Sequence, residues 1–210
     1  MSRDPAAFIR ANLKLEPVTS LPGVVLYTAH SGSRLSRLGT PDDAAPYWAW
    51  QWAGGLALAQ HIRMHPEVAK GKRALDLGAG SGLVGIVAAQ AGAIASAAEI
   101  DANGQAAIAL NAAANRVALP LLEVDIDGDA PPDLDLILAG DVFYLAEVAQ
   151  RMLPFLQRCA AAGIIVLIGD PGRRDLPIDW LTPLASYAVG DVGDARAATG
   201  RLGNVYALRA

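Results

Sequence analysis

The sequence predicts an α/β fold: a mostly parallel sheet of seven strands, with helices on both faces and a C-terminal antiparallel hairpin. From residue 73 onward, short apolar segments alternate with alanine-rich segments long enough to form helices. The apolar segments are continuous rather than alternating in polarity, which is what strands buried on both faces require. With 53% hydrophobic and 18% charged residues among 210, the chain is too apolar to be disordered. Its length suits one globular domain with an appended segment.

The first part of the chain, residues 1–45, is the least regular, and we expect it to be an N-terminal extension of a domain formed by residues 46–210. The extension is expected to hold a short helix at 5–15, an extended segment at 24–27 and a polar loop at 31–46. The domain then begins with a helix at 48–64, where apolar residues recur at helical spacing and a proline follows the end.

The sheet is expected from residue 73 onward, with strands and helices in alternation. The strand segments are short and apolar: 73–77, 93–98, 120–124, 134–139 and 164–168. The helix segments between them are longer and rich in alanine: 83–91, 103–115 and 146–161. Two final strands, 187–189 and 205–208, are expected to pair as a hairpin across the Gly- and Asp-rich loop 190–203.

A glycine-rich turn between the first strand and the next helix is the strongest functional motif. Glycines let the backbone turn sharply and approach a ligand, and the amides at the start of the helix favour polar or anionic atoms. Two motifs overlap here: Asp76-x-Gly78-x-Gly80-x-Gly82, as in S-adenosylmethionine methyltransferases, and Gly80-x-Gly82-x-x-Gly85, which satisfies the dinucleotide fingerprint. An acid at the end of the second strand, Glu99, suits ribose hydroxyls in either case.

Two further segments favour the first motif. Asp125 follows the third strand, where it could accept a hydrogen bond from an adenine amino group, and Gly140-Asp141-Val142-Phe143-Tyr144 follows the fourth. This order resembles the Rossmann-like, seven-β-strand (class I) S-adenosylmethionine-dependent protein methyltransferases, whose lysine-specific members carry an acid-x-x-aromatic motif after the fourth strand. Together with Pro46–Gly55 and Ile168–Arg173, it is similar to the branch that methylates the electron-transfer flavoprotein β subunit. The resemblance covers residues 46–173.

The resemblance implies S-adenosylmethionine as cofactor and assigns a role to most of the residues named above. Trp52 would form a wall of the cofactor pocket, and Asp125 or the backbone of Ile126 would bind the adenine. The remaining cofactor-binding residues would be Asp76 at the end of the first strand, Gly78 and Gly80 beneath the methionine part, Glu99 at the ribose, and Ala139 and Gly140 near the sulfonium. Asp141 and Tyr144 would face the incoming amine as catalytic residues.

Several of these residues also have plainer interpretations. Trp52 could be a core or interface aromatic, and Asp141 could cap the helix that follows it. The segment Asp170–Gly172 is an ordinary turn sequence. His61 and His65 lie four residues apart but lack the glutamate of the zinc-protease motif, so we expect surface histidines and no metal site.

Composition limits the classes of binding partner and the cellular compartments that are expected. A net charge of −4 argues against a nucleic-acid binder that relies on a broad basic surface. The single cysteine, Cys159, excludes an internal disulfide and suits a reducing compartment. The segment Met1–Pro5 lacks the apolar run of a secretory signal, so the cytoplasm is expected. The uncharged segment 77–98 is long enough to span a membrane, but its glycines favour a turn, and no membrane association is expected.

The expected substrate is a lysine-bearing protein, which the resemblance implies is the electron-transfer flavoprotein β subunit. Acidic residues without any Lys or Arg occupy residues 123–141, and we expect some of them to attract such a basic surface, although Asp133 and Asp135 could lie at the opposite edge of the sheet. Two alternatives remain open: a small-molecule N-methyltransferase for a nicotinamide-like amine, and an NAD-dependent oxidoreductase or non-catalytic nucleotide-binding module.

Overall fold

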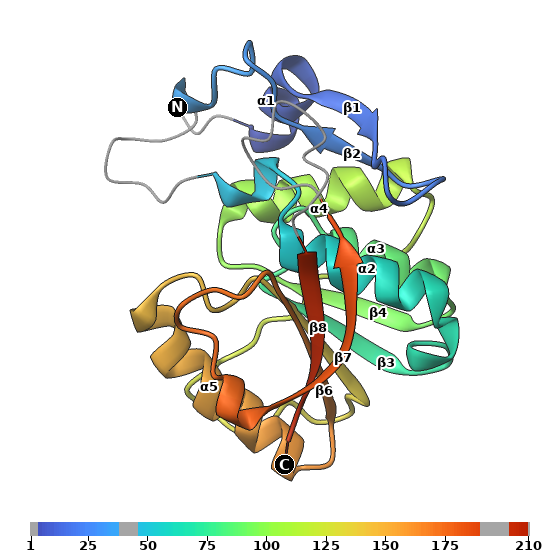
Figure 1. Ribbon diagram of the computed structural model, residues 1–210. Coiled ribbons are helices and arrows are strands. Elements are labelled where there is room, and N and C mark those ends of the chain that lie inside the picture. Colours follow the sequence, from blue (N-terminus) through green and yellow to red (C-terminus); the bar gives the residue numbers. More distant parts are fainter. Residues whose placement is uncertain (1–3, 38–45, 190–201, 210) are drawn as a thin grey trace.

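A six-stranded sheet forms the centre of the protein (Figure 1). The computed structural model describes residues 4–37, 46–189 and 202–209. The strands are β3 (Arg73–Leu77), β4 (Ile94–Ala98), β5 (Leu136–Gly140), β6 (Ile165–Asp170), β7 (Leu181–Ala188) and β8 (Leu202–Leu208). Their order is β4-β3-β5-β6-β8-β7; the first four are parallel, and β8 is antiparallel to both of its neighbours. The α/β class and the antiparallel C-terminal hairpin are therefore confirmed.

The expected number of seven strands is wrong, because the segment 120–124 forms no strand. It touches the edge of the sheet through one isolated parallel bridge between Ala97 and Leu121. The Ala97 amide donates to the Pro120 carbonyl and the Leu122 amide donates to the Ala97 carbonyl, both at 2.9 Å. Pro120 has no amide hydrogen to extend the ladder of hydrogen bonds. Residues 120–123 are exposed, so further pairing would bury no apolar face.

Helices cover both faces of the sheet, as expected, and alternate residues of each strand face opposite cores. Three helices, α2 (Ala53–Met64), α3 (Leu83–Gln90) and α4 (Ala102–Ala114), contribute to one core, while α5 (Ala146–Ala161) covers the other. In β5, Leu136 and Leu138 belong to the first core, and Ile137 and Ala139 to the second. This division explains why the strands read as continuous apolar runs.

The hairpin of β7 and β8 is longer than the sequence indicates. Only the end of β7 was expected, since Pro183 interrupts the strand pattern, and the structure places this proline at a register shift in the edge strand. The expected connecting loop at 190–203 lies mostly outside the described residues. Among the residues that are described, no helix is long and apolar enough to cross a membrane.

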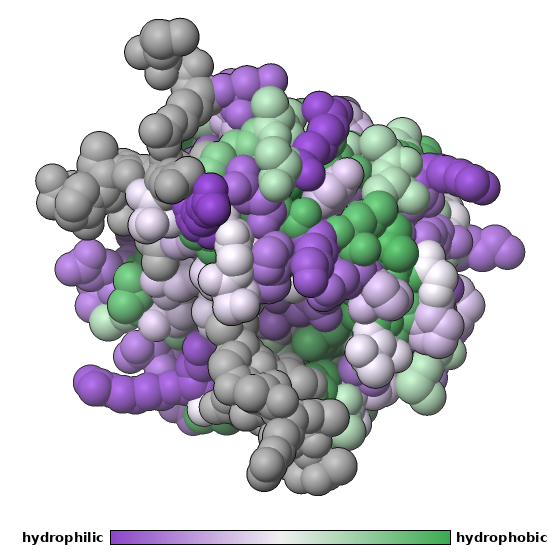
Figure 2. Space-filling model, turned by 90° about the horizontal axis from the view of Figure 1, so that it is seen from above, coloured by the Kyte–Doolittle hydropathy of each residue, from purple (hydrophilic) through white to green (hydrophobic). Residues whose placement is uncertain are grey.

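The N-terminal residues pack on the outside of α4. Helix α1 (Pro5–Asn12) begins where the Asp4 carboxylate accepts the amides of the first turn. A hairpin of β1 (Lys14–Pro17) and β2 (Val25–Thr28) follows; β1 was not expected, because the helix expected at 5–15 ends at Asn12 and the next residues form this strand. Seen from above, this end of the molecule is largely hydrophilic with apolar areas between (Figure 2). The division at residue 45 stays a prediction, and most of the expected polar loop lies outside the described residues.

One buried asparagine joins this N-terminal hairpin to the rest of the fold. Asn111, on α4, is 0% exposed; its amide oxygen accepts the Tyr27 amide at 2.8 Å, and its amide nitrogen donates to the Ser81 carbonyl at 2.8 Å. The side chain thus links β2 to the glycine-rich turn before α3. Asn115, one turn later, bonds both backbone groups of Val25 in the same way.

We predict that Asn111→Ala lowers the free energy of unfolding by about 2–4 kcal/mol, because it leaves a buried amide and a buried carbonyl without partners. Urea unfolding followed by circular dichroism measures the loss. Ala109→Asn, on the exposed side of the same helix, serves as the control and should change stability by less than about 0.7 kcal/mol. Equal losses in both variants would contradict the role given to Asn111.

Candidate active site

The glycine-rich turn lies where β3 ends and α3 begins. Gly78 and Gly80 have φ values of +68° and +54°, which side chains other than glycine rarely adopt. Outside the two neighbouring residues, the described atom nearest to a Cβ built on Gly80 would be the Trp48 Cα, at 3.8 Å. The backbone at Gly80 is therefore open on one side, where a ligand can approach it.

Glu99 lies at the end of β4 and is held beside this turn. One carboxylate oxygen accepts the Gly80 amide at 2.8 Å and the other accepts the Asp101 amide at 2.9 Å. Each oxygen keeps a further lone pair for another donor. The structure thus brings Glu99 and Gly80 together, as the sequence predicts, and leaves an oriented carboxylate that suits ribose hydroxyls.

Asp76 lies beneath the turn rather than on its open side. It is 2% exposed and accepts the Gly85 amide at 2.8 Å, which fastens the first turn of α3 to the end of β3. Burial raises the pKa of Asp76 to about 7; the Gly85 hydrogen bond opposes this rise and the Glu99 charge adds to it. Its place gives it a structural role, and direct contact with a cofactor stays a prediction.

The expected adenine-binding residues lie in the loop that precedes β5. The Asp125 carboxylate accepts the Asp127 amide at 3.0 Å, which is a local turn, and the Ile126 carbonyl accepts the Arg158 guanidinium at 2.8 Å. The side chain of Asp125 is exposed. The adenine role of these two residues remains a prediction.

Four glycines let the start of α2 approach the ends of β5 and β6. A Cβ on Gly140 would lie 2.9 Å from the Gly55 Cα, and one on Gly54 would overlap the Gly169 carbonyl and lie 2.6 Å from an Asp141 carboxylate oxygen. Only Gly140 among them was expected at the site. The glycine pair at 54–55 within a helical pattern was the available indication of close packing.

This close approach fixes the side chain of Asp141, which follows β5 directly. Its φ is +58° and its amide donates to the Gly169 carbonyl at 2.9 Å. One carboxylate oxygen accepts the Gly55 amide at 2.9 Å and the other accepts the Arg173 guanidinium at 2.6 Å. Burial raises the pKa of Asp141, while Arg173 and the amides of Gly54 and Gly55 lower it.

The interpretation of Asp141 as a cap for the following helix is wrong. That helix, α5, begins only at Ala146 and has Leu145 at its N-cap. Asp141 instead caps α2, whose own N-cap residue, Trp52, provides no side-chain hydrogen bond. The carboxylate therefore connects the end of β5 with the start of a helix 86 residues earlier in the chain.

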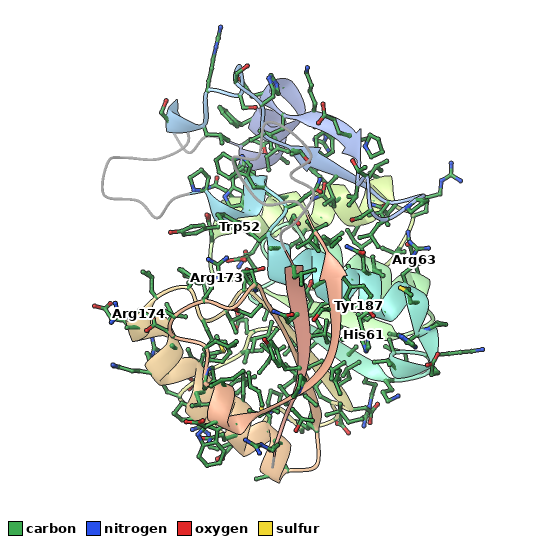
Figure 3. The ribbon with its side chains drawn as sticks, viewed as in Figure 1. Trp52, His61, Arg63, Arg173, Arg174 and Tyr187 are labelled. Atoms are coloured by element: carbon green, nitrogen blue, oxygen red, sulfur yellow. The ribbon has the colours of Figure 1, made fainter. Side chains whose placement is uncertain are left out.

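An aromatic cluster lies beside Arg173, the arginine that pairs with Asp141. The Trp52 indole nitrogen donates to the Tyr47 carbonyl at 2.8 Å, and the Tyr47 ring lies 5.6 Å from that of Trp52 and 5.3 Å from that of Tyr144. Tyr144 is 40% exposed, so the cluster opens to the surface. The Arg173 guanidinium lies 5.9 Å from the Trp52 ring centre, and Figure 3 shows the two on the same side of the molecule. Trp52 and Tyr144 thus belong to one aromatic cluster, and Arg173 connects that cluster to Asp141.

Comparison with known proteins shows the family of this chain. Residues 49–185 match the model of a family described as lysine methyltransferase. The chain belongs to this lysine methyltransferase family. It is 42% identical over 131 residues to the electron transfer flavoprotein beta subunit lysine methyltransferase of Danio rerio, a match that covers 61% of this chain and 51% of that protein. The same enzyme of Rattus norvegicus is 41% identical, with the same coverage.

The chain spans about half the length of these curated relatives. Among solved structures, the ribosomal protein L11 methylase of Lactobacillus delbrueckii subsp. bulgaricus superposes with a TM-score of 0.50 at 23% identity, covering 73% of this chain and 79% of that one. That likeness concerns the fold alone.

The cofactor of this lysine methyltransferase family member is S-adenosylmethionine. The residues present fit it, because Glu99 offers an oriented carboxylate and Gly80 an open backbone at the same edge. The third glycine of the dinucleotide fingerprint has a packing role instead: a Cβ on Gly85 would lie 2.8 Å from the Leu119 side chain. Ala139 is fully buried at the end of β5, and Gly140 lies against Gly55.

The acidic segment 123–141 is more neutralised than the sequence indicates. Asp133 and Asp135 pair with Arg73 at the start of β3, the edge opposite the glycine turn, at 2.8 and 3.4 Å. Asp127 pairs with Arg151 at 2.6 Å, and Asp141 pairs with Arg173. Among the described residues, Glu123, Asp125 and Asp129 have no ion pair, so the expected attraction of a basic surface would depend on these three acids and stays a prediction.

Two other side chains mentioned above are buried. His61 is 7% exposed rather than on the surface, because its ring packs against Tyr187 with Nδ1 2.8 Å from the tyrosine oxygen; burial lowers the pKa of His61. Cys159 is 0% exposed in α5, as expected of a small apolar residue, and burial raises its pKa to about 11. Within the described ranges, no group of three or more His, Cys, Asp or Glu could hold a metal.

We predict that Glu99→Gln weakens binding of S-adenosylhomocysteine by about 10- to 150-fold, which corresponds to about 1.5–3 kcal/mol for lost charge-assisted hydrogen bonds. Isothermal titration calorimetry measures the dissociation constant. Asp129→Asn removes one exposed carboxylate, 30 residues further along the chain, and should leave the dissociation constant unchanged. An unaltered constant in Glu99→Gln would remove this residue from the cofactor site.

The raised pKa of Asp76 predicts a pH-dependent stability. An acid whose pKa rises on folding, here from 3.8 to about 7, binds its proton more tightly in the folded state, so it destabilises the fold increasingly as pH rises through this interval. Asp76→Asn should therefore unfold in urea like the wild type at pH 4 but be more stable than it at pH 8. Parallel stability curves for the two proteins would show that Asp76 is not the group responsible.

Proposed function

We propose that this chain is an S-adenosylmethionine-dependent protein-lysine N-methyltransferase that acts on the electron-transfer flavoprotein β subunit. The observation that carries the proposal is the carboxylate of Asp141, held at the end of β5 beside an exposed aromatic cluster. The names of the two relatives support the choice of substrate. We place the protein in the cytoplasm, because its single cysteine suits a reducing compartment.

The chain's residues would bring a lysine amine into line and keep water away. When bound, S-adenosylmethionine supplies a methyl group on a positively charged sulfur, which moves to nitrogen by in-line displacement. A lysine amine has an ordinary pKa near ~10.4 and must lose a proton before it attacks. Tyr47, Trp52 and Tyr144 offer aromatic surfaces that bind a cation and exclude water. Asp141 would orient the amine and accept its proton, for which its raised pKa is suited.

Two features support a protein substrate over a small amine or a nucleic acid. Tyr47 and Tyr144 are 41% and 40% exposed, so the amine site opens at the surface, where a side chain from another protein can reach it. The net charge of −4 provides no broad basic surface for nucleic acid. The alternative of a nicotinamide-like amine stays an outcome of the test below.

We predict transfer of labelled methyl groups to purified electron-transfer flavoprotein, and a loss of at least about 100-fold in Asp141→Asn with cofactor binding retained, since a positioned proton acceptor contributes about that factor. Scintillation counting of the flavoprotein band measures transfer, and calorimetry with S-adenosylhomocysteine measures binding. Asp129→Asn is the matched control, because it removes an exposed aspartate outside the aromatic cluster.

Two results would contradict this proposal. Methylation of nicotinamide or another small amine with the flavoprotein left unmodified would favour the small-molecule alternative. Full activity of Asp141→Asn would show that another group handles the amine.

A further inference from the structure

An arginine occupies the side of Asp141 on which the substrate amine is proposed to bind. Arg173, in the loop that follows β6, donates to the Asp141 carboxylate at 2.6 Å and lies 5.9 Å from the Trp52 ring centre. A cation held between a carboxylate and an aromatic ring is the arrangement that a lysine ammonium would adopt at the same place. The Asp141 side chain is only 10% exposed, so a lysine cannot pair with it while Arg173 stays where it is.

A second carboxylate lies behind Arg173 and is only half used. Asp170, at the end of β6, has a fully buried side chain. One of its oxygens accepts the amides of Gly172 and Arg173 at 2.7 and 2.6 Å, which fixes the carboxylate in a tight turn. The other oxygen, Oδ2, is buried and has no hydrogen-bond partner among the described residues.

Arg173 carries the matching unused donor. Its Nε is also buried, has no hydrogen-bond partner in the part of the chain that the structure describes, and lies 3.9 Å from the unused oxygen of Asp170. A hydrogen bond between a nitrogen and a carboxylate oxygen needs about 2.7–2.9 Å, so a shift of roughly 1 Å would form it. Leaving two buried polar groups unpaired is costly, and their proximity marks a second position for the guanidinium.

We infer that Arg173 is a positioning residue that takes the place of the substrate ammonium on Asp141 and moves onto Asp170 when a lysine enters. The inference rests on the role proposed above for Asp141. The charges become balanced when the lysine enters. Before the lysine arrives, one guanidinium serves two carboxylates; afterwards Asp141 faces the lysine ammonium and Asp170 faces Arg173.

The exchange also explains why the site tolerates a second buried acid. Arg173 and Asp170 are the charged groups that interact with Asp141, and a lone lysine entering beside Arg173 would meet a like charge. Asp170 gives the guanidinium an acceptor that keeps it buried and away from the incoming cation. The alternative is a fixed clamp, in which Arg173 holds Asp141 throughout and Asp170 only shapes the turn.

Two variants separate the exchange from the clamp in steady-state methylation of electron-transfer flavoprotein. Asp170→Asn keeps a side-chain oxygen for the turn but removes the second anion, so the KM for the protein should rise about 10- to 100-fold, the cost of one lost charge-assisted hydrogen bond, with kcat nearly unchanged. Arg173→Gln vacates Asp141, so the KM should not rise. In the Arg173→Gln variant, the acidic limb of the pH profile of kcat/KM should move to higher pH by about 1–3 units, because Asp141 loses the neighbouring positive charge.

Arg173→Lys retains a positive charge and should keep the acidic limb of the pH profile near its wild-type position. If Arg173 and Asp170 had a merely structural role, all three variants would lower kcat and leave both KM and the pH profile unchanged. This result would overturn the inference. So would an Asp170→Asn enzyme whose KM equals that of the wild type.

An activity-independent measurement keeps the inference testable if the flavoprotein is not the substrate. We expect the Nε–H nuclear magnetic resonance signal of Arg173 to shift when n-butylammonium is added to the protein with S-adenosylhomocysteine, and to stay fixed in Asp170→Asn. A wild-type signal unchanged at every n-butylammonium concentration would overturn the exchange. Failure of flavoprotein methylation alone would contradict only the proposed substrate.

Discussion

The contact between the start of α2 and the ends of β5 and β6 is the constraint on which the site depends. Gly54 and Gly55 meet Gly140 and Gly169 so closely that a methyl group at any of three of these positions would overlap backbone. Because of this contact, the Asp141 carboxylate reaches the Gly55 amide. The same approach carries Trp52, at the N-cap of α2, to the aromatic cluster. One backbone contact thus fixes the carboxylate and one aromatic wall together.

The sequence predicts best those features that depend on local pattern. The strand at 73–77 and the helix at 146–161 have the expected bounds, since each is a run of suitable residues between clear ends. Glu99 and Gly80 are also found together, because the βαβ order fixes which strand ends are neighbours.

The features that the sequence does not predict depend on contacts between distant segments. The segment at 120–124 has strand-like residues, yet the pairing stops after one bridge. Asp141 was open to interpretation as a local cap because nothing near it in the sequence reveals the amide of Gly55. Likewise, the Asp170–Arg173 segment is an ordinary turn in sequence, and only the fold shows that its guanidinium meets Asp141.

The hydrogen bonds of Asn111, on α4, couple the stability of the N-terminal hairpin to that of the glycine-rich turn before α3. Asn111 bonds β2 with one end of its amide and the Ser81 carbonyl of the glycine turn with the other, so order in either segment supports order in the other. Coupling of this kind is reciprocal. A ligand that orders the glycine turn must protect the hairpin amides from hydrogen exchange, and the free energy of that protection equals the free energy by which a docked hairpin strengthens ligand binding. The outermost strands of the molecule would then report on occupancy of a site that they do not touch.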